Sequence, residues 1–239
     1  MLLLLKNIRR KLTIENRITT YLLYAIGEIT LVVIGILIAV SIDNWNESNR
    51  LQKLEKKLLQ EMISDLEVQA DDITSNILTH RSSLKSCQII LNALTEDQPF
   101  HDSLMLHFGK TYEFTVFENK QGAYKMLENQ GIALIRDDSL RMQITSYFDV
   151  SIVFQLEVQR VTIQQIQAAS ENHLKLFKNF NWSTPLQPWD FEALKRNKEY
   201  ISWLSYASSN KAFEVKRFEQ LLKKNRSLIQ KIKQELSEI

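Results

Sequence analysis

The chain has 239 residues, of which 44% are hydrophobic and 24% are charged. This balance is typical of a folded protein and excludes disorder over most of the length. Only five glycines and three prolines are present, and a turn-rich β-sandwich or β-barrel would need many more. The composition therefore favours an all-α protein. The single cysteine, Cys87, excludes an internal disulfide and any site built on a pair of cysteines.

Basic residues are concentrated at the start of the chain. Residues 1–20 carry five lysines and arginines against one glutamate, a net charge of +4, whereas the whole chain has +2. The charge distribution of the rest therefore gives no support to nucleic-acid binding. Apolar residues at helical spacing among the basic ones predict an amphipathic cytoplasmic leader that lies on the membrane surface. A frayed basic tail is the alternative.

Residues 21–42 predict a transmembrane helix, because a single charged residue, Glu28, interrupts an apolar run. At about 1.5 Å per residue the run reaches roughly 33 Å as a helix, which is enough to cross a bilayer. Aromatic residues lie near both of its edges, as in the belts found at membrane interfaces. These residues are Tyr21, Tyr24 and Trp45.

The basic leader also predicts the orientation of the chain. The positive-inside rule places residues 1–20 in the cytoplasm and residues 43–239 outside it, as expected for an inner-membrane protein with a periplasmic domain. A cleaved signal peptide is the alternative, because Ala39 and Ser41 have the spacing of a cleavage site. The apolar run is longer than a usual signal core, which favours an uncleaved signal anchor.

A resemblance to a known family lies in the segment from Tyr21 to Glu47, which reads YLLYAIGEITLVVIGILIAVSIDNWNE. It is similar to the membrane segment of an uncharacterised family of bacterial single-pass membrane proteins, found mainly in Bacteroidota and known only as a domain of unknown function. The stretch from Ala123 to Phe148, AYKMLENQGIALIRDDSLRMQITSYF, also resembles that family. The resemblance implies a helical protein of the bacterial envelope and brings no activity or cofactor with it.

Three long helical arms are predicted after the transmembrane helix. Glycine and proline, which interrupt helices, are absent from residues 43–98, 132–184 and 189–239. The arms predict an antiparallel, coiled-coil-like helical bundle that continues the transmembrane helix. Residues 99–131 hold three of the five glycines and predict an insert of shorter helices joined by turns.

Apolar residues alternate at spacings of three and four along the first and last arms. One seam runs from Leu66 to Leu94 and the other from Val215 to Ile239. Asn225 falls in the second seam, where it either fixes the register or is capped or solvated. The middle arm is apolar on more than one face, which predicts a central helix packed on several sides.

The lengths of the arms predict their order. The first and middle arms are similar in length, so in an antiparallel bundle the loop 180–190 returns towards Trp45. The last arm then leads outward and leaves Ile239 at the distal end. Within the insert, residues 111–117 alternate as a strand would, but a single strand has nothing to pair with, so a helix is predicted. Asp137 is expected to begin a further helix.

No catalytic or cofactor-binding motif is present. The chain has no phosphate-binding glycine loop, no nucleophile elbow and no zinc-protease motif. Its four histidines are scattered, and His80, which lies in the first seam, is interpreted as an edge residue bonded to a neighbour. Adjacent aspartates point about 100° apart on a helix and so predict no acid–base pair. No catalytic, metal-binding or cofactor-binding residue is expected, and the chain is predicted not to be an enzyme.

One candidate binding surface lies within the transmembrane helix. Glu28, Gly35 and Ala39 fall on one helical face. An ionised carboxylate is costly there unless it is paired, hydrated or protonated, and small residues let another helix approach closely. This pattern predicts association with a second copy or with a membrane-protein partner. A glutamate that snorkels to the headgroups is the alternative.

A second candidate is an aromatic loop, which includes Trp182, Trp189 and Phe191 beside two prolines. Such residues can stack on a sugar or peptide ligand, but closing the end of a helical bundle needs the same residues. The structural interpretation is favoured.

The sequence therefore predicts a membrane-anchored, non-enzymatic scaffold or accessory subunit that acts by protein association. The alternative is a ligand-sensing helical module that signals through a membrane partner. A buried polar cavity between the arms would favour the sensor, whereas an exposed apolar seam would favour association.

Overall fold

The computed structural model describes residues 18–179 and 185–238. All regular secondary structure in the described residues is helical, as the composition predicted. These residues contain no β-strand, only a single bridge between Phe177 and Pro188. The helices are α2 (Ile18–Thr95), α3 (Leu104–Thr111), α4 (Gly122–Gln130), α5 (Asp138–Thr145), α6 (Val153–His173), α7 (Phe191–Arg196) and α8 (Lys198–Glu238). Three short segments join them: the 3₁₀ turns η1 (Ile132–Leu134) and η3 (Leu174–Leu176), and the π-helix η2 (Ser146–Ile152).

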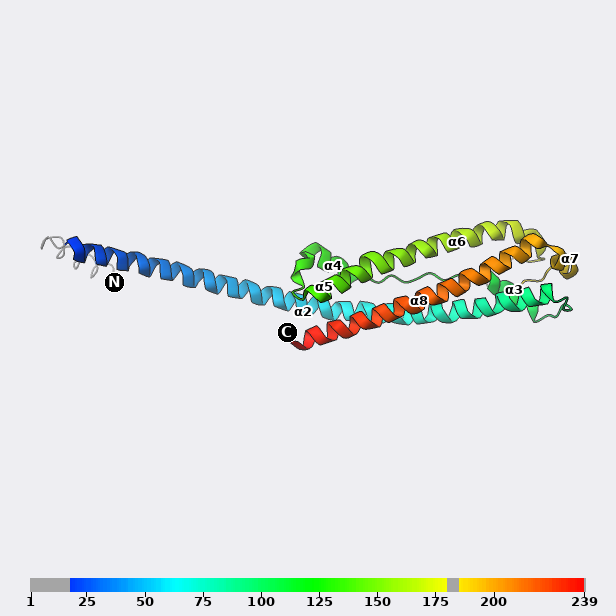
Figure 1. Ribbon diagram of the computed structural model, residues 1–239, viewed down its shortest axis with the longest axis horizontal. Helices are drawn as coiled ribbons and strands as arrows, with labels where there is room; N and C mark the ends of the chain where they lie inside the picture. The colour runs from blue at the N-terminus through cyan, green and yellow to red at the C-terminus, as the bar shows by residue number, and fades with distance from the viewer. Residues whose placement is uncertain (1–17, 180–184, 239) are drawn as a thin grey trace. The chain divides into compact units, whose positions relative to one another are not determined.

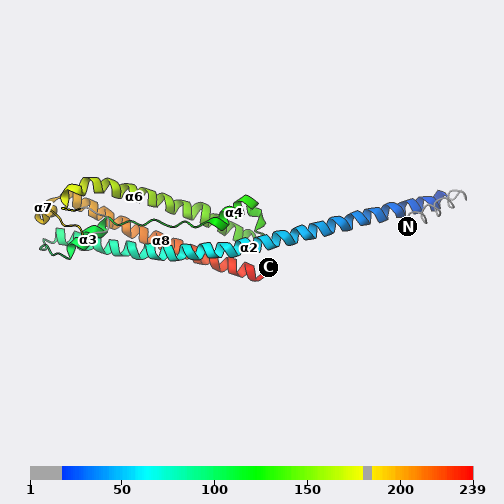
Figure 2. The same cartoon turned by 180° about the vertical axis from the view of Figure 1, so that it is seen from behind.

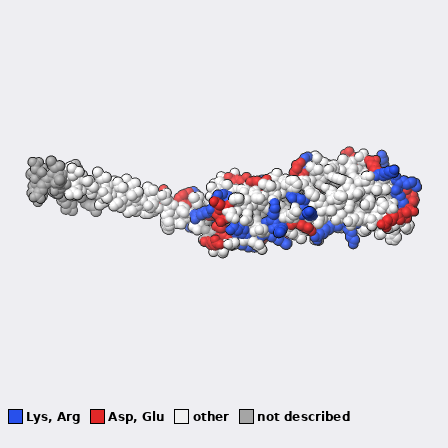
Figure 3. Space-filling view, viewed as in Figure 1, with Lys and Arg blue, Asp and Glu red and all other residues white. Residues whose placement is uncertain are grey.

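The chain divides into two compact units, Met1–Leu54 and Glu55–Ile239. The first unit contributes the apolar part of α2, which is long and apolar enough to cross a membrane and is not buried by the part of the chain that the structure describes. This part is almost uniformly free of charged side chains in the space-filling view (Figure 3). The basic leader expected over residues 1–20 lies largely outside the described residues.

The second unit is a bundle of three long helical rods, formed by α2 beyond Leu54, by α5–η2–α6 and by α8 (Figures 1 and 2). Lys233, near the end of α8, pairs with Glu67 at 3.0 Å. Lys195, just before α8, pairs with Asp97, just after α2, at 2.8 Å. These two ion pairs show that α8 runs antiparallel to α2.

The middle rod runs parallel to α2. Tyr147, at the start of the rod, donates a hydrogen bond to Gln69 at 2.7 Å. Ile166, near its end, belongs to the same buried cluster as Ile90, close to the end of α2. The order predicted from the lengths, in which the middle arm returns along the first, is therefore wrong.

The connection between the rods explains this difference. Residues 113–121 have no regular structure, so the helix predicted over 111–117 is also wrong beyond Thr111, where α3 ends. Ser83 donates to Glu113, and Asp65 accepts from the backbone N–H of Ala123. The chain thus advances ten residues from Glu113 to Ala123 and covers the same distance as the eighteen residues of α2 between Ser83 and Asp65, about 27 Å. Ten residues can reach this far only if their backbone is nearly extended. The chain has already returned before the middle rod begins.

A row of polar side chains on α2, buried apart from the half-buried Asp72, makes this connection possible, and we call it the polar stripe. Buried backbone groups need hydrogen-bond partners, and an extended segment without a neighbouring strand cannot supply them itself. Gln69 donates to the Lys120 carbonyl, and Asp72 accepts from the Glu118 N–H at 3.0 Å. Asp65 accepts from the Ala123 N–H at the end of the connection, and His80 and Ser83 bond to the side chains of Thr115 and Glu113.

The aromatic segment follows from this order of the rods. The ring of Phe191 lies 5.3 Å from that of Phe100, and the Leu186 N–H donates to the Met105 carbonyl at 2.9 Å. The described part of the loop 180–190 therefore lies at the end of the bundle where α2 ends, which contradicts the predicted return towards Trp45. Because α8 runs back from this end, its last turns lie at the opposite end of the bundle, where Lys233 pairs with Glu67. Ile239, which was predicted to lie at the distal end, is outside the described residues.

The two predicted seams face the interior of the bundle. Leu66, Ile73 and Leu94 on α2 are buried, as are Phe218 and Ile232 on α8. The middle rod does not lie at the centre, contrary to prediction. In a three-helix bundle each helix has only two neighbours, so the outer apolar face of this rod stays in contact with solvent. That face includes Val150, Val153 and Phe154, of which Val150 is 62% exposed.

Candidate functional site

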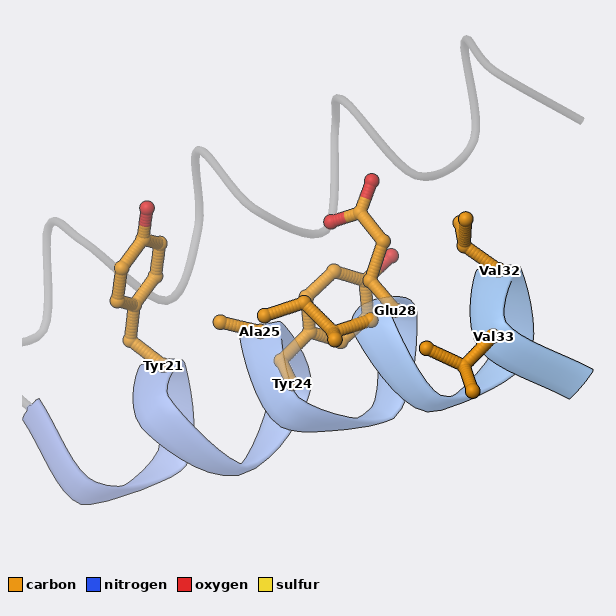
Figure 4. A pocket seen from close by; sticks show the side chains of 7 residues that line it. Tyr21, Tyr24, Ala25, Glu28, Val32 and Val33 are labelled. Carbon is orange, nitrogen blue, oxygen red and sulfur yellow. The ribbon is translucent and has the colours of Figure 1, made fainter.

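The predicted association face lies on the apolar part of α2. Figure 4 shows Tyr21, Tyr24 and Glu28 projecting from the same side of the helix, where they line a shallow hollow. An ideal Cβ added to Gly35 would meet no heavy atom within 4 Å. Nothing in the described part of this chain therefore requires a glycine at that position, and the space beside Gly35 is open to another molecule.

Two hydroxyl groups of this segment form hydrogen bonds within the helix itself, so they need no water. The Thr30 hydroxyl donates to the Ile26 carbonyl at 2.8 Å, and the Ser41 hydroxyl donates to the Leu37 carbonyl at 2.7 Å. Such bonds to the preceding turn satisfy hydroxyl groups within the helix itself, which a bilayer requires.

The segment ends in polar and aromatic residues. Trp45 is exposed, as an aromatic at the membrane interface would be. Beyond it, Arg50 forms two hydrogen bonds with the carboxylate of Glu47, at 2.7 and 2.8 Å. This exposed ion pair raises the pKa of Arg50 and lowers that of Glu47 through hydrogen bonding.

A buried polar cluster lies among the three rods. The ammonium group of Lys211 donates to the carbonyl of Glu113, and burial lowers its pKa. Glu214 accepts hydrogen bonds from Thr162 at 2.8 Å and from Gln155 at 3.5 Å. Lys211 and Glu214 are therefore each hydrogen-bonded in the interior, as buried polar groups must be.

His80 belongs to the same region. Its Nε2 lies 2.9 Å from the Thr115 hydroxyl, and its ring stacks on Phe218 with centroids 5.5 Å apart. Burial, reinforced by the positive charge of Lys211, lowers the pKa of His80 to about 3. The imidazole is therefore neutral at physiological pH. The bond to Thr115 agrees with the prediction of a histidine bonded to a neighbour, although its side chain is fully inside the bundle.

The cavity beside this cluster is too small for a ligand. It is lined by His80, Gln155, Glu214 and Phe218 among others and has a volume of about 10 Å³. Roughly this volume is needed for a single water molecule. No group of three or more potential ligand residues for a metal ion occurs among the described residues. The polar cluster therefore fills the space among the rods and leaves room for about one water molecule.

Sequence reasoning did not identify the polar stripe or the burial of Lys211 and Glu214. A signal for the stripe was present: Asp65, Gln69, Asp72 and Asn76 follow spacings of four and three, which place them on one face beside the apolar seam. Polar residues at such spacing usually indicate a solvated face. What distinguishes this one is the extended segment that covers it, and the sequence does not place that segment.

The aromatic residues close the end of the bundle. Tyr112 stacks on Trp203 with ring centroids 4.5 Å apart, and its hydroxyl lies 2.8 Å from Nδ1 of His173. Phe191 is buried in the same cluster, whereas Trp189 is 65% exposed beside Lys178. Trp182 lies outside the described residues. The structure thus brings Phe191 into the core and leaves Trp189 at the surface.

Comparisons with known proteins identify a family. A family model described as a family of unknown function, DUF6090, matches residues 28–181, more than half of the chain. The match begins at Glu28 and so covers most of the apolar segment of α2 together with the first two rods of the bundle. No curated protein and no solved structure matches the chain.

Proposed function

The chain belongs to DUF6090, a family of unknown function, and we propose that it is a single-pass bacterial membrane protein that works by association with other proteins. In this proposal residues 21–42 anchor the chain in the cytoplasmic membrane, and the bundle lies in the periplasm. The protein is a scaffold or accessory subunit and does not catalyse a reaction.

The exposure of the apolar segment supports the anchor. Its large side chains, from Leu22 to Ile42, are about half to three quarters exposed. Contiguous apolar surface of this extent is rare on soluble monomers and indicates contact with a membrane or a partner. The aromatic residues at its edges and the internally bonded hydroxyls suit a bilayer.

The face that Gly35 shares with Glu28 and Ala39, open beside the glycine, is the observation that carries the association. Glu28 lies seven residues earlier and Ala39 four residues later, so all three share one helical face. Another helix could approach the backbone closely along this face, and a donor on it could pair with the Glu28 carboxylate. The homotypic case, a second copy of this chain, is the simplest partner.

Fusion proteins test the orientation. Alkaline phosphatase folds into an active enzyme only outside the cytoplasm, whereas green fluorescent protein exported by the general secretory route does not fluoresce. A C-terminal phosphatase fusion should therefore be active and a C-terminal fluorescent fusion dark. The reverse pattern would contradict the proposed topology, and loss of the first 41 residues from the mature protein would contradict an uncleaved anchor.

Crosslinking in membranes tests the association face. Gly35→Ile places a branched side chain where the neighbouring backbone approaches, and we expect it to weaken association by about 1–2 kcal/mol. Glu28→Gln keeps the shape and removes the charge. Gly27→Ile is the matched control, because Gly27 also meets nothing within 4 Å but lies about 80° away around the helix. Equal crosslinking in all three variants would show that the segment is a plain anchor.

A further inference from the structure

A groove runs along the second unit between the α5–η2 part of the middle rod and α8. It has a volume of about 780 Å³, within the range of ligand-binding pockets and far larger than the cavity beside His80. Its floor includes the buried Tyr147 and Leu228, and the exposed Met142 lies at its rim. Both walls come from helices that pack against each other, so the groove is preformed in the bundle.

Three cations face this groove without an opposite charge. Arg217, Lys223 and Lys224 are among its lining residues, and none of the lining residues is acidic. None of the three cations forms an ion pair with the part of the chain that the structure describes. By contrast, Lys231 and Lys233 further along α8 pair with Asp137 and Glu67. The groove is therefore a local concentration of unpaired positive charge.

Two of these cations are held in place by the middle rod. The guanidinium of Arg217 lies 4.3 Å from the ring centroid of Phe154, and its Nε is buried without a hydrogen-bond partner. The ammonium group of Lys224 donates to the Ser151 hydroxyl at 2.8 Å. Positioned cations lose less side-chain freedom when they bind an anion.

The π-helix η2 forms part of the wall. It contributes Ser146 and Tyr147 to the groove, and Ser151 to the position of Lys224. A π-helical segment is uncommon and is found frequently at functional sites, because it changes the direction of side chains relative to an α-helix. Its location at this groove, within an otherwise α-helical rod, is a second observation independent of the charge.

We propose that the groove between α5–η2 and α8 binds an acidic, extended segment of a partner protein. From Arg217 to Leu228 the groove follows eleven residues of α8, about 17 Å, which corresponds to roughly five residues of extended peptide. Arg217 and Lys224 are about 10 Å apart along the helix, so their charges match carboxylates spread along a chain better than a single phosphate group.

The neutral lining residues also fit a peptide. A peptide backbone offers both donors and acceptors, whereas a phosphate or lipid headgroup offers chiefly acceptors. Hydroxyl and side-chain amide groups can bond to both the donors and the acceptors of a peptide backbone. Five residues with such groups line the groove: Ser139, Gln143, Ser146, Gln220 and Ser227. The apolar floor would take one apolar side chain of the segment. This inference rests on the proposed role in protein association and names the chemistry of the partner.

Binding of a labelled peptide tests the proposal. The probe is a short fluorescein-labelled peptide of glutamates around one leucine, titrated with the full chain in neutral detergent micelles at low salt and followed by anisotropy. The double variant Lys223→Glu/Lys224→Glu should bind the probe at least about tenfold more weakly. The matched control is Lys216→Glu/Arg226→Glu, which makes the same charge change on exposed residues of α8 outside the groove. We expect it to weaken binding less than about twofold.

Three outcomes would overturn the proposal. Undetectable binding to the full chain would exclude this peptide chemistry. An equal loss in both double variants would show attraction by net charge alone. Displacement of the probe by phosphatidylglycerol added to the micelles, without displacement by unlabelled peptide, would assign the groove to an anionic lipid. Association of the membrane segment is measured separately, by crosslinking of the Gly35→Ile and Glu28→Gln variants. The peptide test can therefore fail while association in the membrane stands, and association in the membrane can fail while the peptide binds.

Discussion

At the scale of single residues, burial decides the charge state of His80. Its imidazole is enclosed by Phe218 and Thr115 and lies near the positive charge of Lys211. Protonation would place a second cation in the interior, where solvation by water is lost. The folded state therefore binds a proton at His80 much less readily than the unfolded chain does.

This difference predicts an acid dependence of stability. The pKa of His80 is about 3 in the folded state against 6.5 in the unfolded chain. The stabilising effect is complete above pH 6.5 and is lost as the pH falls from 6.5 towards 3, because the unfolded state gains the proton first. Between pH 7 and pH 5 the free energy of unfolding should fall by about 2 kcal/mol through this residue.

Urea unfolding of the protein and of His80→Gln at several pH values measures this effect. The variant loses the ring contact at every pH, but it has no imidazole to titrate. The difference in unfolding free energy between the two proteins should therefore shrink by about 2 kcal/mol between pH 7 and pH 5. A difference that does not depend on pH would show that His80 titrates equally in both states.

At the scale of secondary structure, α4 depends on a side chain from another helix. The residue before α4, Gln121, makes no capping bond with its own side chain. The carboxylate of Asp65 accepts from the N–H of Ala123 at 2.9 Å, in the first turn of α4. A carboxylate at this end also interacts favourably with the helix dipole. The polar stripe of α2 thus fixes where α4 begins.

Substitution of Asp65 tests this dependence. Asp65→Ala leaves the buried Ala123 N–H without its acceptor, and we expect the unfolding free energy to fall by about 1–3 kcal/mol. Asp65→Asn keeps an acceptor oxygen and should cost less. Asp71→Ala, on the exposed face of α2, should change stability by no more than about 0.5 kcal/mol. Equal effects of the alanine substitutions at 65 and 71 would contradict a capping role for Asp65.

At the scale of the whole molecule, the order of the rods can be read from ion pairs. Carbodiimide treatment joins an amine and a carboxylate only where they are in contact. Crosslinks should therefore form between Lys233 and Glu67 and between Lys195 and Asp97, whose charged atoms lie 3.0 and 2.8 Å apart. Mass spectrometry of the digested protein would identify both.

Glu67→Gln provides the control for this measurement. It should abolish the crosslink to Lys233 and leave the crosslink between Lys195 and Asp97 unchanged. If Lys233 were instead joined to carboxylates near Asp97, α8 would run parallel to α2 and the fold would be wrong.

The sequence by itself determined the features that depend on local pattern. The apolar run after Tyr21, the scarcity of glycine and proline, and the seam beginning at Leu66 predicted the helices and their buried faces. Asp137 was correctly expected at the start of a helix, since it caps α5 through the Leu140 N–H. These features arise from residues a few positions apart, so helical periodicity is enough to find them.

Only the tertiary structure decided how the rods are ordered and what lies between them. That order depends on whether residues 113–121 are compact or extended, which is settled by hydrogen bonds to Asp65, Gln69 and Asp72, more than 40 positions away. The burial of Asn225 depends in the same way on its bonds to the Leu66 carbonyl and the Tyr147 hydroxyl. The groove, likewise, forms only where two separate rods meet. Contacts between residues distant in the chain leave no periodic signal, so a single sequence cannot specify them.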